Sequence, residues 1–111
     1  MKLYFQFNQS SCSMSILLVH NVSETDDRVF EPKKLRQLQR ECPAMKLPGV
    51  LGHNAWRDVN KEVLYAEIEL ENFAALDAWE AWWATSEGDE WRQKFWATGK
   101  VNHRTILSKV E

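Results

Sequence analysis

The chain has 111 residues, which is enough for one domain with one hydrophobic core. Hydrophobic residues make up 44% of it and charged residues 27%, as in ordinary globular proteins. The formal net charge of -2 provides no basic surplus for binding phosphates, so nucleic acid is not expected as a partner. No apolar run approaches the roughly 20 residues that cross a bilayer, so a membrane-spanning segment is not expected either.

The first thirteen residues differ in character from the rest of the chain. A short apolar stretch, Lys2–Phe7, precedes a polar stretch, Asn8–Ser13. We therefore expect residues 1–13 to be a peripheral extension, an alternative start or an expression remnant, and residues 14–111 to form the single domain. The run Ile16–Val19 is too short for a signal-peptide core, and the two cysteines are isolated in sequence. This favours a cytoplasmic protein with reduced thiols.

A strand and a helix are predicted for the start of the domain. Residues 15–22 are mostly apolar, with His20 and Asn21 near the end, which is typical of a central strand. Pro32 suits the first turn of a helix, where its missing N–H has no partner to lose, and Pro43 ends that helix. The apolar stripe of the helix is Leu35, Leu38 and Cys42, and its basic side, which we expect to be solvated rather than to bind an anion, is Lys33, Lys34, Arg36 and Arg40.

Two further strands come after a Pro48-Gly49 turn. The second strand is expected at 50–58 and the third at 62–70, with a hairpin connection at 59–61. The third strand alternates clearly, so that one face should pack against a helix and the other should not. The first face is Leu64, Ala66, Ile68 and Leu70, and the second is Val63, Tyr65, Glu67 and Glu69.

The segment 72–95 carries four of the six tryptophans. Asn72 is a suitable N-cap, and an apolar face recurs at helical spacing after it. Ser86-Glu87-Gly88 interrupts this pattern, and a second short helix is expected after it, ending near Gly99. The first helix should bury Phe73, Leu76, Trp79 and Trp83, and the second should bury Trp91 and Phe95, while Asp77 and Glu80 fall on the more polar side.

Alternation over 102–110 predicts a fourth strand. The order is then strand, helix, strand, strand, helix, strand, which indicates an α+β, ferredoxin-like βαββαβ fold with an antiparallel four-stranded sheet and both helices on one face. The other face would mix apolar groups with Glu67, Glu69 and Arg104. Such a face usually needs a partner, and a homodimer formed sheet on sheet is the simplest one.

With these elements the chain resembles the dimeric α/β-barrel superfamily, which includes antibiotic-biosynthesis-type monooxygenases, haem-degrading monooxygenases and stress-responsive barrel proteins. The resemblance covers residues 14–111 in element order and is closest in 69–83 and 86–95. It implies a homodimer with a cavity between helices and sheet. Members that oxidise planar polycyclic substrates without a prosthetic group line this cavity with aromatic residues.

The haem-degrading branch of that superfamily has an Asn at the end of the first strand, a Trp on the second helix and a His about three turns later. Asn21 and Trp79 match the first two positions. Phe95, or Lys94 with another gap placement, stands at the third, and no histidine is near. Without this axial ligand haem is not expected, and no cofactor is predicted.

The remaining candidates for chemistry are few. The three histidines, His20, His53 and His103, show no close metal-ligand spacing, so no metal site is predicted. His53 could serve as a general base in the cavity or lie half-exposed on an edge strand. Glu67 and Glu69 share a strand face, where they could form an acid–base pair or, as we favour, pair with basic groups across the dimer interface.

Two functions from different classes remain in view. The first is a homodimer that binds a small apolar or aromatic molecule and acts as a cofactor-independent monooxygenase. Its candidate catalytic residues are Asn21, Trp79 and His53, and its candidate ligand-binding residues are Trp56, Tyr65, Trp83 and Phe95. The alternative is a non-catalytic dimerisation or stress-response module in which the aromatic residues simply fill the core. An open cavity beside Asn21 and Trp79 would separate the two.

Overall fold

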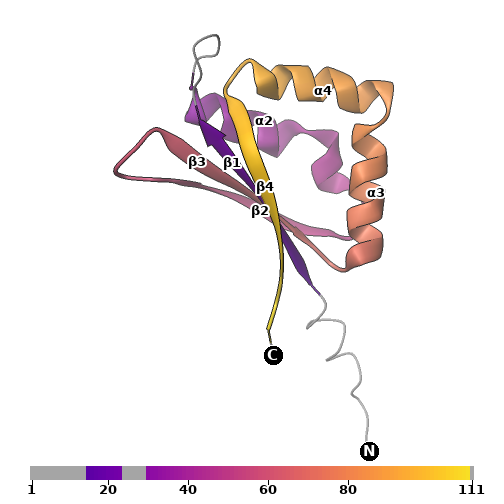
Figure 1. The fold of residues 1–111 in the computed structure, drawn as a ribbon. Coiled ribbons are helices and arrows are strands. Elements are labelled where there is room, and N and C mark those ends of the chain that lie inside the picture. Colours follow the sequence, from indigo (N-terminus) through magenta and orange to yellow (C-terminus); the bar gives the residue numbers. More distant parts are fainter. Residues whose placement is uncertain (1–14, 24–29, 111) are drawn as a thin grey trace, which may run out of the picture.

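The computed structural model describes residues 15–23 and 30–110, and its elements have the order predicted from the sequence (Figure 1). The predicted extension at 1–13 and the loop residues 24–28 lie outside the described part of the chain. The elements are β1 (Ile16–Ser23), α2 (Pro32–Glu41), the 3-10 helix η1 (Pro43–Lys46), β2 (Val50–Arg57), β3 (Val63–Leu70), α3 (Phe73–Trp83), α4 (Ser86–Trp96) and β4 (Lys100–Ser108).

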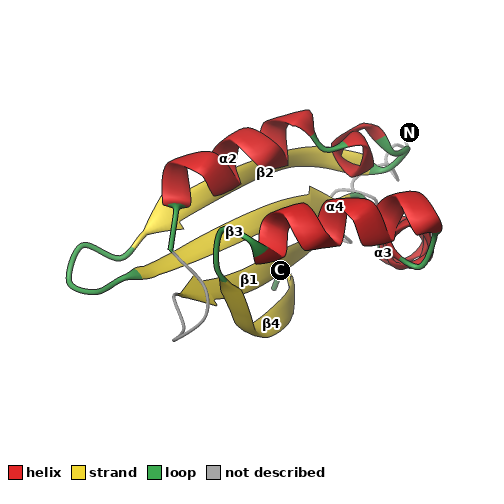
Figure 2. Ribbon diagram, turned by 90° about the horizontal axis from the view of Figure 1, so that it is seen from above, coloured by secondary structure: helices red, strands yellow, loops and turns green. Residues whose placement is uncertain are grey.

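The four strands form one antiparallel sheet in the order β2-β3-β1-β4. Figure 2 shows α2 and α4 running beside each other along one side of this sheet, with α3 seen nearly end-on. The ferredoxin-like α+β fold predicted from the sequence is therefore confirmed. Within the described ranges, none of the helices has the length and apolar character needed to cross a bilayer.

The hydrophobic core lies between the sheet and the helices. Alternate residues of β1 and β3 point into it, as the period of two in a strand requires. These core-facing residues include Ile16, Leu18, Val22, Leu64, Ile68 and Leu70, all at most 3% exposed, and Ala66, which is 9% exposed. The predicted alternation of the third strand is therefore correct, and the opposite face of the sheet has no helix of the described chain upon it (Figure 2).

The aromatic segment forms two helices joined at a sharp corner (Figure 1). Asn72 caps α3 as predicted, because its side-chain oxygen accepts a hydrogen bond from the Ala75 N–H at 2.9 Å. The break comes at Ala84, earlier than predicted, and Thr85 caps α4 by accepting from the Gly88 N–H at 3.0 Å. The prediction that Phe73 is buried was wrong: this residue is 53% exposed because it stands in the first turn, beyond the edge of the core.

A β-bulge in the pairing of β1 with β4 changes which residues of β4 face the helices. His20 lies opposite Arg104, but the register shifts between Asn21 and Val22, so that Val22 lies opposite Val101. Residues 101 and 104 therefore both reach the helix side, which strict alternation forbids. The placement of Arg104 on the open face was wrong, because this bulge turns it toward the helices.

Candidate functional site

A cavity of about 350 Å³ lies between the helices and the sheet. Its walls come from α2, α3 and α4 and from β1, β3 and β4. Most of the lining is apolar, and the aromatic side chains among it are those of Trp79, Trp83, Phe95 and Trp96. A hollow of this size with an apolar wall and a few polar groups is the usual form of a small-molecule site.

The aromatic wall is ordered by contacts between its rings. The centroids of Trp79 and Trp83 are 5.8 Å apart at an interplanar angle of 59°, and those of Trp83 and Phe95 are 6.1 Å apart at 63°. Trp82 packs edge-on against Trp83 from outside the cavity lining, with centroids 4.8 Å apart. These tilted arrangements suit the charge distribution of aromatic rings and fix the wall.

Three polar side chains meet at one end of this cavity. His20 comes from β1, Arg104 from the facing position of β4, and Glu80 from α3. An Arg104 guanidinium nitrogen lies 2.6 Å from Glu80 Oε2, an ion pair between two partly exposed side chains. Among the described residues the imidazole of His20 has no side-chain hydrogen-bond partner.

The surroundings keep His20 uncharged at neutral pH. Burial, followed by the positive charge of Arg104, lowers the pKa of this imidazole from 6.5 to about 4, and the Glu80 carboxylate opposes that shift only in part. His20 therefore presents a neutral ring with one donor and one acceptor nitrogen.

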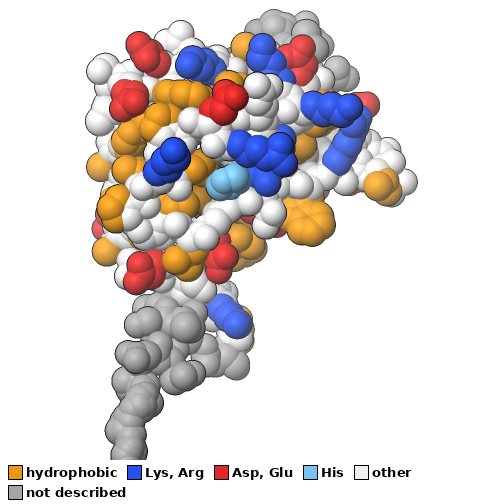
Figure 3. Space-filling view, turned by 180° about the vertical axis from the view of Figure 1, so that it is seen from behind, with side chains coloured by type: hydrophobic (Ala, Val, Ile, Leu, Met, Phe, Trp, Pro, Cys, Tyr) orange, Lys and Arg blue, Asp and Glu red, His pale blue; other side chains and the backbone are white. Residues whose placement is uncertain are grey.

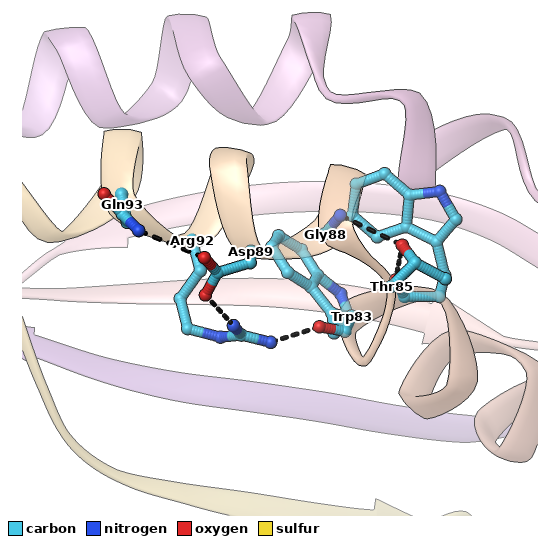
Figure 4. A network of polar contacts seen from close by, with 7 residues as sticks. Trp83, Thr85, Gly88, Asp89, Arg92 and Gln93 are labelled. Carbon is cyan, nitrogen blue, oxygen red and sulfur yellow. Dashed lines mark hydrogen bonds and ion pairs between the residues drawn. The ribbon is translucent and has the colours of Figure 1, made fainter.

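A second guanidinium, that of Arg92 on α4, also borders the cavity. It donates to Asp89 Oδ1 at 2.9 Å and to the main-chain oxygen of Trp83, and it lies over the Trp83 ring (Figure 4). The Asp89 carboxylate also accepts from Gln93 Nε2 at 3.1 Å (Figure 4). Arg92 is thus bound across the α3–α4 corner and holds Trp83 in place.

The structure brings together three of the predicted site residues. Trp79, predicted as catalytic, is 3% exposed, and with the predicted ligand-binding residues Trp83 and Phe95 it lines the same cavity. A cavity beside Trp79 is one of the features that the sequence interpretation required of a ligand-binding protein. The roles given to these residues stay predictions.

The other four predicted site residues do not line this cavity. Asn21 and Tyr65 are opposite each other in the sheet and share its open face, where Asn21 Oδ1 accepts from Asn102 Nδ2 at 3.0 Å. Trp56, opposite Tyr65, is 60% exposed on the same side. His53 is on the helix side but lies under α2, with its Nδ1 2.8 Å from Arg36 Nη1.

The rear of the molecule offers less for chemistry. Figure 3 shows Lys and Arg side chains gathered in the middle of that face, with hydrophobic side chains among them. The contact of His53 with Arg36 belongs to a structural network, because Arg36 also donates to the buried Gln39, whose amide donates to the main-chain oxygens of Asn54 at 3.0 Å and Glu67 at 3.3 Å. Burial, then Arg36 and Arg40, lowers the pKa of His53.

We assign no functional site to a second hollow or to the buried cysteine. A hollow of about 360 Å³ at the end of the sheet is bordered by Leu17, Leu107 and their neighbours, with Glu69 and Lys109 as its charged groups. Burial raises the pKa of the Cys42 thiol to about 11, which does not suit a nucleophile. No cluster of His, Cys, Asp or Glu with metal-binding geometry occurs in residues 15–23 and 30–110.

The sequence interpretation missed the polar end of the cavity. A signal for His20 was present, because alternation along β1 puts it on the same face as Ile16, Leu18 and Val22. Glu80 comes four residues after Leu76, which puts both on one helix face. Arg104 had no such signal, since its direction depends on the bulge.

Comparison with known proteins gives a fold and no closer relation. No family model matches the chain, and no curated protein matches it in sequence. Solved structures do match, and they include antibiotic-biosynthesis-monooxygenase-like proteins of the ferredoxin fold. The chain shares that fold, so the resemblance predicted from the sequence is confirmed at this level.

Three of these structures illustrate the match. A mutant of SnoaB, a cofactor-independent oxygenase from Streptomyces nogalater, is 11% identical with a TM-score of 0.69, over 88% of this chain and 95% of that one. A proposed antibiotic biosynthesis monooxygenase from Caulobacter crescentus CB15 is 15% identical with a TM-score of 0.64, over 94% and 97%. A conserved protein from Methanosarcina mazei Go1 is 14% identical with a TM-score of 0.62, over 92% and 99%.

Proposed function

We propose that this protein is a homodimeric, cytoplasmic monooxygenase that needs no cofactor and takes a small planar apolar substrate into the helix–sheet cavity. The observation that carries the proposal is the cavity of about 350 Å³ itself, which is walled by Trp79, Trp83 and Phe95 and is polar at one end. A flat ring system can stack on such a wall, while the polar end meets its oxygen substituents. The alternative, a module with a filled core, is less well supported because the space beside Trp79 is open.

The proposed chemistry relies on the substrate as electron donor. A methylene that lies between two aromatic rings, and is conjugated through them with a carbonyl, loses a proton to water and gives a stabilised anion. The anion adds dioxygen to form a peroxide, and this peroxide takes up a proton again before it expels water. The overall change is CH2 + O2 → C=O + H2O: one oxygen atom forms the new carbonyl, the other leaves as water, and the two C–H hydrogens complete that water. The protein would supply orientation, exclusion of bulk water and cationic groups near the developing anion, and Arg104 and Arg92 are placed at the cavity for this.

The homodimer in this proposal would use the open face of the sheet. Apolar and polar residues alternate across it in register, with Leu17 between Glu69 and Leu107, and Asn21 between Tyr65 and His103. Leu107 is 46% exposed and Trp56 60% exposed on this side. A two-fold axis would bury such a mixed patch against itself, and Asn21, Trp56 and Tyr65 then become interface residues in place of cavity residues.

Anthrone, a tricyclic ketone with an acidic methylene, tests the proposed activity. We expect the protein to accelerate oxygen uptake and anthraquinone formation, and Trp79→Phe to lower kcat/KM about tenfold, because a smaller ring leaves part of the wall missing. Trp91→Phe is the matched control, because Trp91 lies on α4 outside the cavity lining, and it should leave turnover unchanged. Anthrone oxidation at the spontaneous rate would reject the activity, and equal turnover by Trp79→Phe and wild type would reject the site.

A further inference from the structure

The lining of the cavity includes charged side chains as well as apolar ones. The lining contains two guanidinium groups, on Arg92 and Arg104, and one carboxylate, on Glu80, while His20 is neutral because its pKa lies at about 4. The remaining lining is largely apolar. A neutral hydrocarbon ligand would make no ionic contact with these side chains.

The two guanidinium groups differ in the number of hydrogen bonds and ion pairs that they already form. Arg92 is bound between Asp89 and the Trp83 main-chain oxygen, and both interactions stabilise the corner of the helices. Within the described ranges, Arg104 forms one ion pair, with Glu80 at 2.6 Å, and a guanidinium has five N–H donors in a planar fork. Donors of Arg104 therefore remain for an acceptor that enters the cavity.

His20 completes the arrangement from the neighbouring strand. It lies directly opposite Arg104 in the β1–β4 pairing, on the same side of the sheet, and it is half-buried. Since its imidazole has no hydrogen-bond partner among the described residues, an N–H of the ring can donate to the same acceptor. Glu80, from α3, sets the position of the guanidinium but also competes for its donors.

We propose that the cavity selects planar apolar ligands that carry one carboxylate, which Arg104 binds with His20 as a second donor. The inference rests on the proposed function and names the class of ligand for that cavity. The ring system of the ligand stacks on Trp79 and Trp83, and its carboxylate points to the ion pair. Arg104 and His20 are then specificity-determining residues, and Glu80 positions Arg104 and weakens its hold on the ligand.

The test compares two probes with the same ring system. Anthracene-9-carboxylate carries the charge, and 9-anthracenemethanol is its neutral counterpart. We expect the wild-type protein to bind the carboxylate at least about tenfold more tightly by equilibrium dialysis at pH 7, as a charge-assisted hydrogen bond to the partly exposed Arg104 guanidinium predicts. Arg104→Gln should remove this preference and leave the affinity for the alcohol within about twofold.

Two more variants separate ligand recognition from structure. Glu80→Gln removes the competing carboxylate, so affinity for anthracene-9-carboxylate should rise, whereas loss of a merely structural ion pair would lower it. Arg57→Gln breaks another Arg–Glu pair, 3.1 Å long and outside the cavity lining, and should change neither affinity. Circular dichroism on each variant checks the fold, and Glu80→Gln still tests the inference if Arg104→Gln does not fold.

The outcomes for this inference and for the proposed function differ. Equal binding of the two probes by wild type, or weaker carboxylate binding by Glu80→Gln, overturns the carboxylate inference and leaves the cavity as a binding site. Failure of both probes to bind overturns the cavity as a site for planar ligands, and the proposed function with it.

Discussion

At the scale of single residues, His20 links the cavity to the stability of the fold. Its imidazole has a pKa of about 4 in the native state against 6.5 as the ordinary value, chiefly because of burial and then because of Arg104. Between these two values the unfolded chain binds more protons at this position than the native chain does. Stability must therefore fall as the pH falls from about 6.5 toward 4, with no effect of this group above 6.5.

The prediction is that His20→Gln makes the acid side of the stability profile shallower. The full pKa shift of His20 would lower the free energy of unfolding by at most about 3 kcal/mol between pH 7 and pH 4. We expect a smaller decrease, because the ring is only half-buried and solvent screens its charge. Urea unfolding at pH 7.5 and at pH 4.5 measures the difference for both proteins. A wild-type and variant difference that is the same at both pH values would contradict the native pKa of His20.

His53 should also make the protein less stable as the pH falls. Its pKa is also lowered, mainly by burial and then by Arg36 and Arg40. The double variant His20→Gln/His53→Gln should therefore have the shallowest acid profile. The effects of the two substitutions on the free energy of unfolding are expected to be additive, because the two histidines lie under different helices and share no described partner.

Residue patterns predicted one wall of the site and missed the other. Helical spacing puts Trp79 and Trp83 on one face of α3, and the corner between the helices brings Phe95 of α4 to the same cavity. Asn21 was predicted as a catalytic residue because of a family resemblance. Alternation along β1 places the side chain of His20, and not that of Asn21, on the cavity side of the sheet. Successive side chains of a strand point to opposite faces of the sheet, so an error of one residue in the assignment moves the predicted side chain to the wrong face.

At the scale of elements, the corner between α3 and α4 is held by a close approach of two backbones. Gly88 lies in the first turn of α4, and a Cβ built on it would lie 2.6 Å from Trp83 Cα and 2.8 Å from Trp83 C. These are main-chain atoms of a packed helix end, so they cannot move aside as a flexible side chain would. The corner therefore requires glycine at this position.

We predict that Gly88→Ala destabilises the protein by about 2 kcal/mol and lowers the thermal midpoint by about 10 °C. The steric cost should exceed the gain of up to about 1 kcal/mol from helix propensity. Gly52→Ala in β2 is the control, because no atom lies within 4 Å of the Cβ that it would add. A Gly88→Ala midpoint at or above that of Gly52→Ala would contradict the close approach, and differential scanning calorimetry measures both.

Element order could be predicted from sequence more completely than element ends. The N-cap at Asn72 and the prolines at 32 and 43 are local signals, and the structure places helix boundaries at them. The break at Ala84–Thr85 was placed late, because Ser86, Glu87 and Gly88 have the composition of a loop although they form the first turn of α4 under the Thr85 cap. The bulge at Asn21–Val22 has no local signal at all, since it arises from pairing with a strand some 80 residues away.

At the scale of the whole molecule, the helices of the described residues all lie on one side of the sheet (Figure 2). β4 is exposed along all nine of its residues, on both of its faces. An antiparallel sheet can present one face to water when that face is polar, but here Leu17, Val19 and Leu107 interrupt the polar residues. The monomer alone therefore leaves apolar area that association would remove from water.

A single charge on this face tests the proposed dimer. We expect sedimentation velocity to show a wild-type dimer, and Leu107→Glu to raise its dissociation constant about a hundredfold or more, because the new carboxylate would be buried beside Leu17 and close to Glu69. Val59→Glu is the matched control: Val59 is 94% exposed at the β2–β3 turn, away from this face, and the variant should remain a dimer.

The possible results for Leu107→Glu assign the contact and relate it to the cavity. A wild-type monomer at all concentrations would reject the homodimer, whereas a dimeric Leu107→Glu with native circular dichroism would assign the contact to another surface. Cavity and interface lie on opposite sides of one sheet, so Leu107→Glu should also leave the affinity for anthracene-9-carboxylate unchanged. A loss of that affinity on dissociation would mean that the partner subunit contributes to the site.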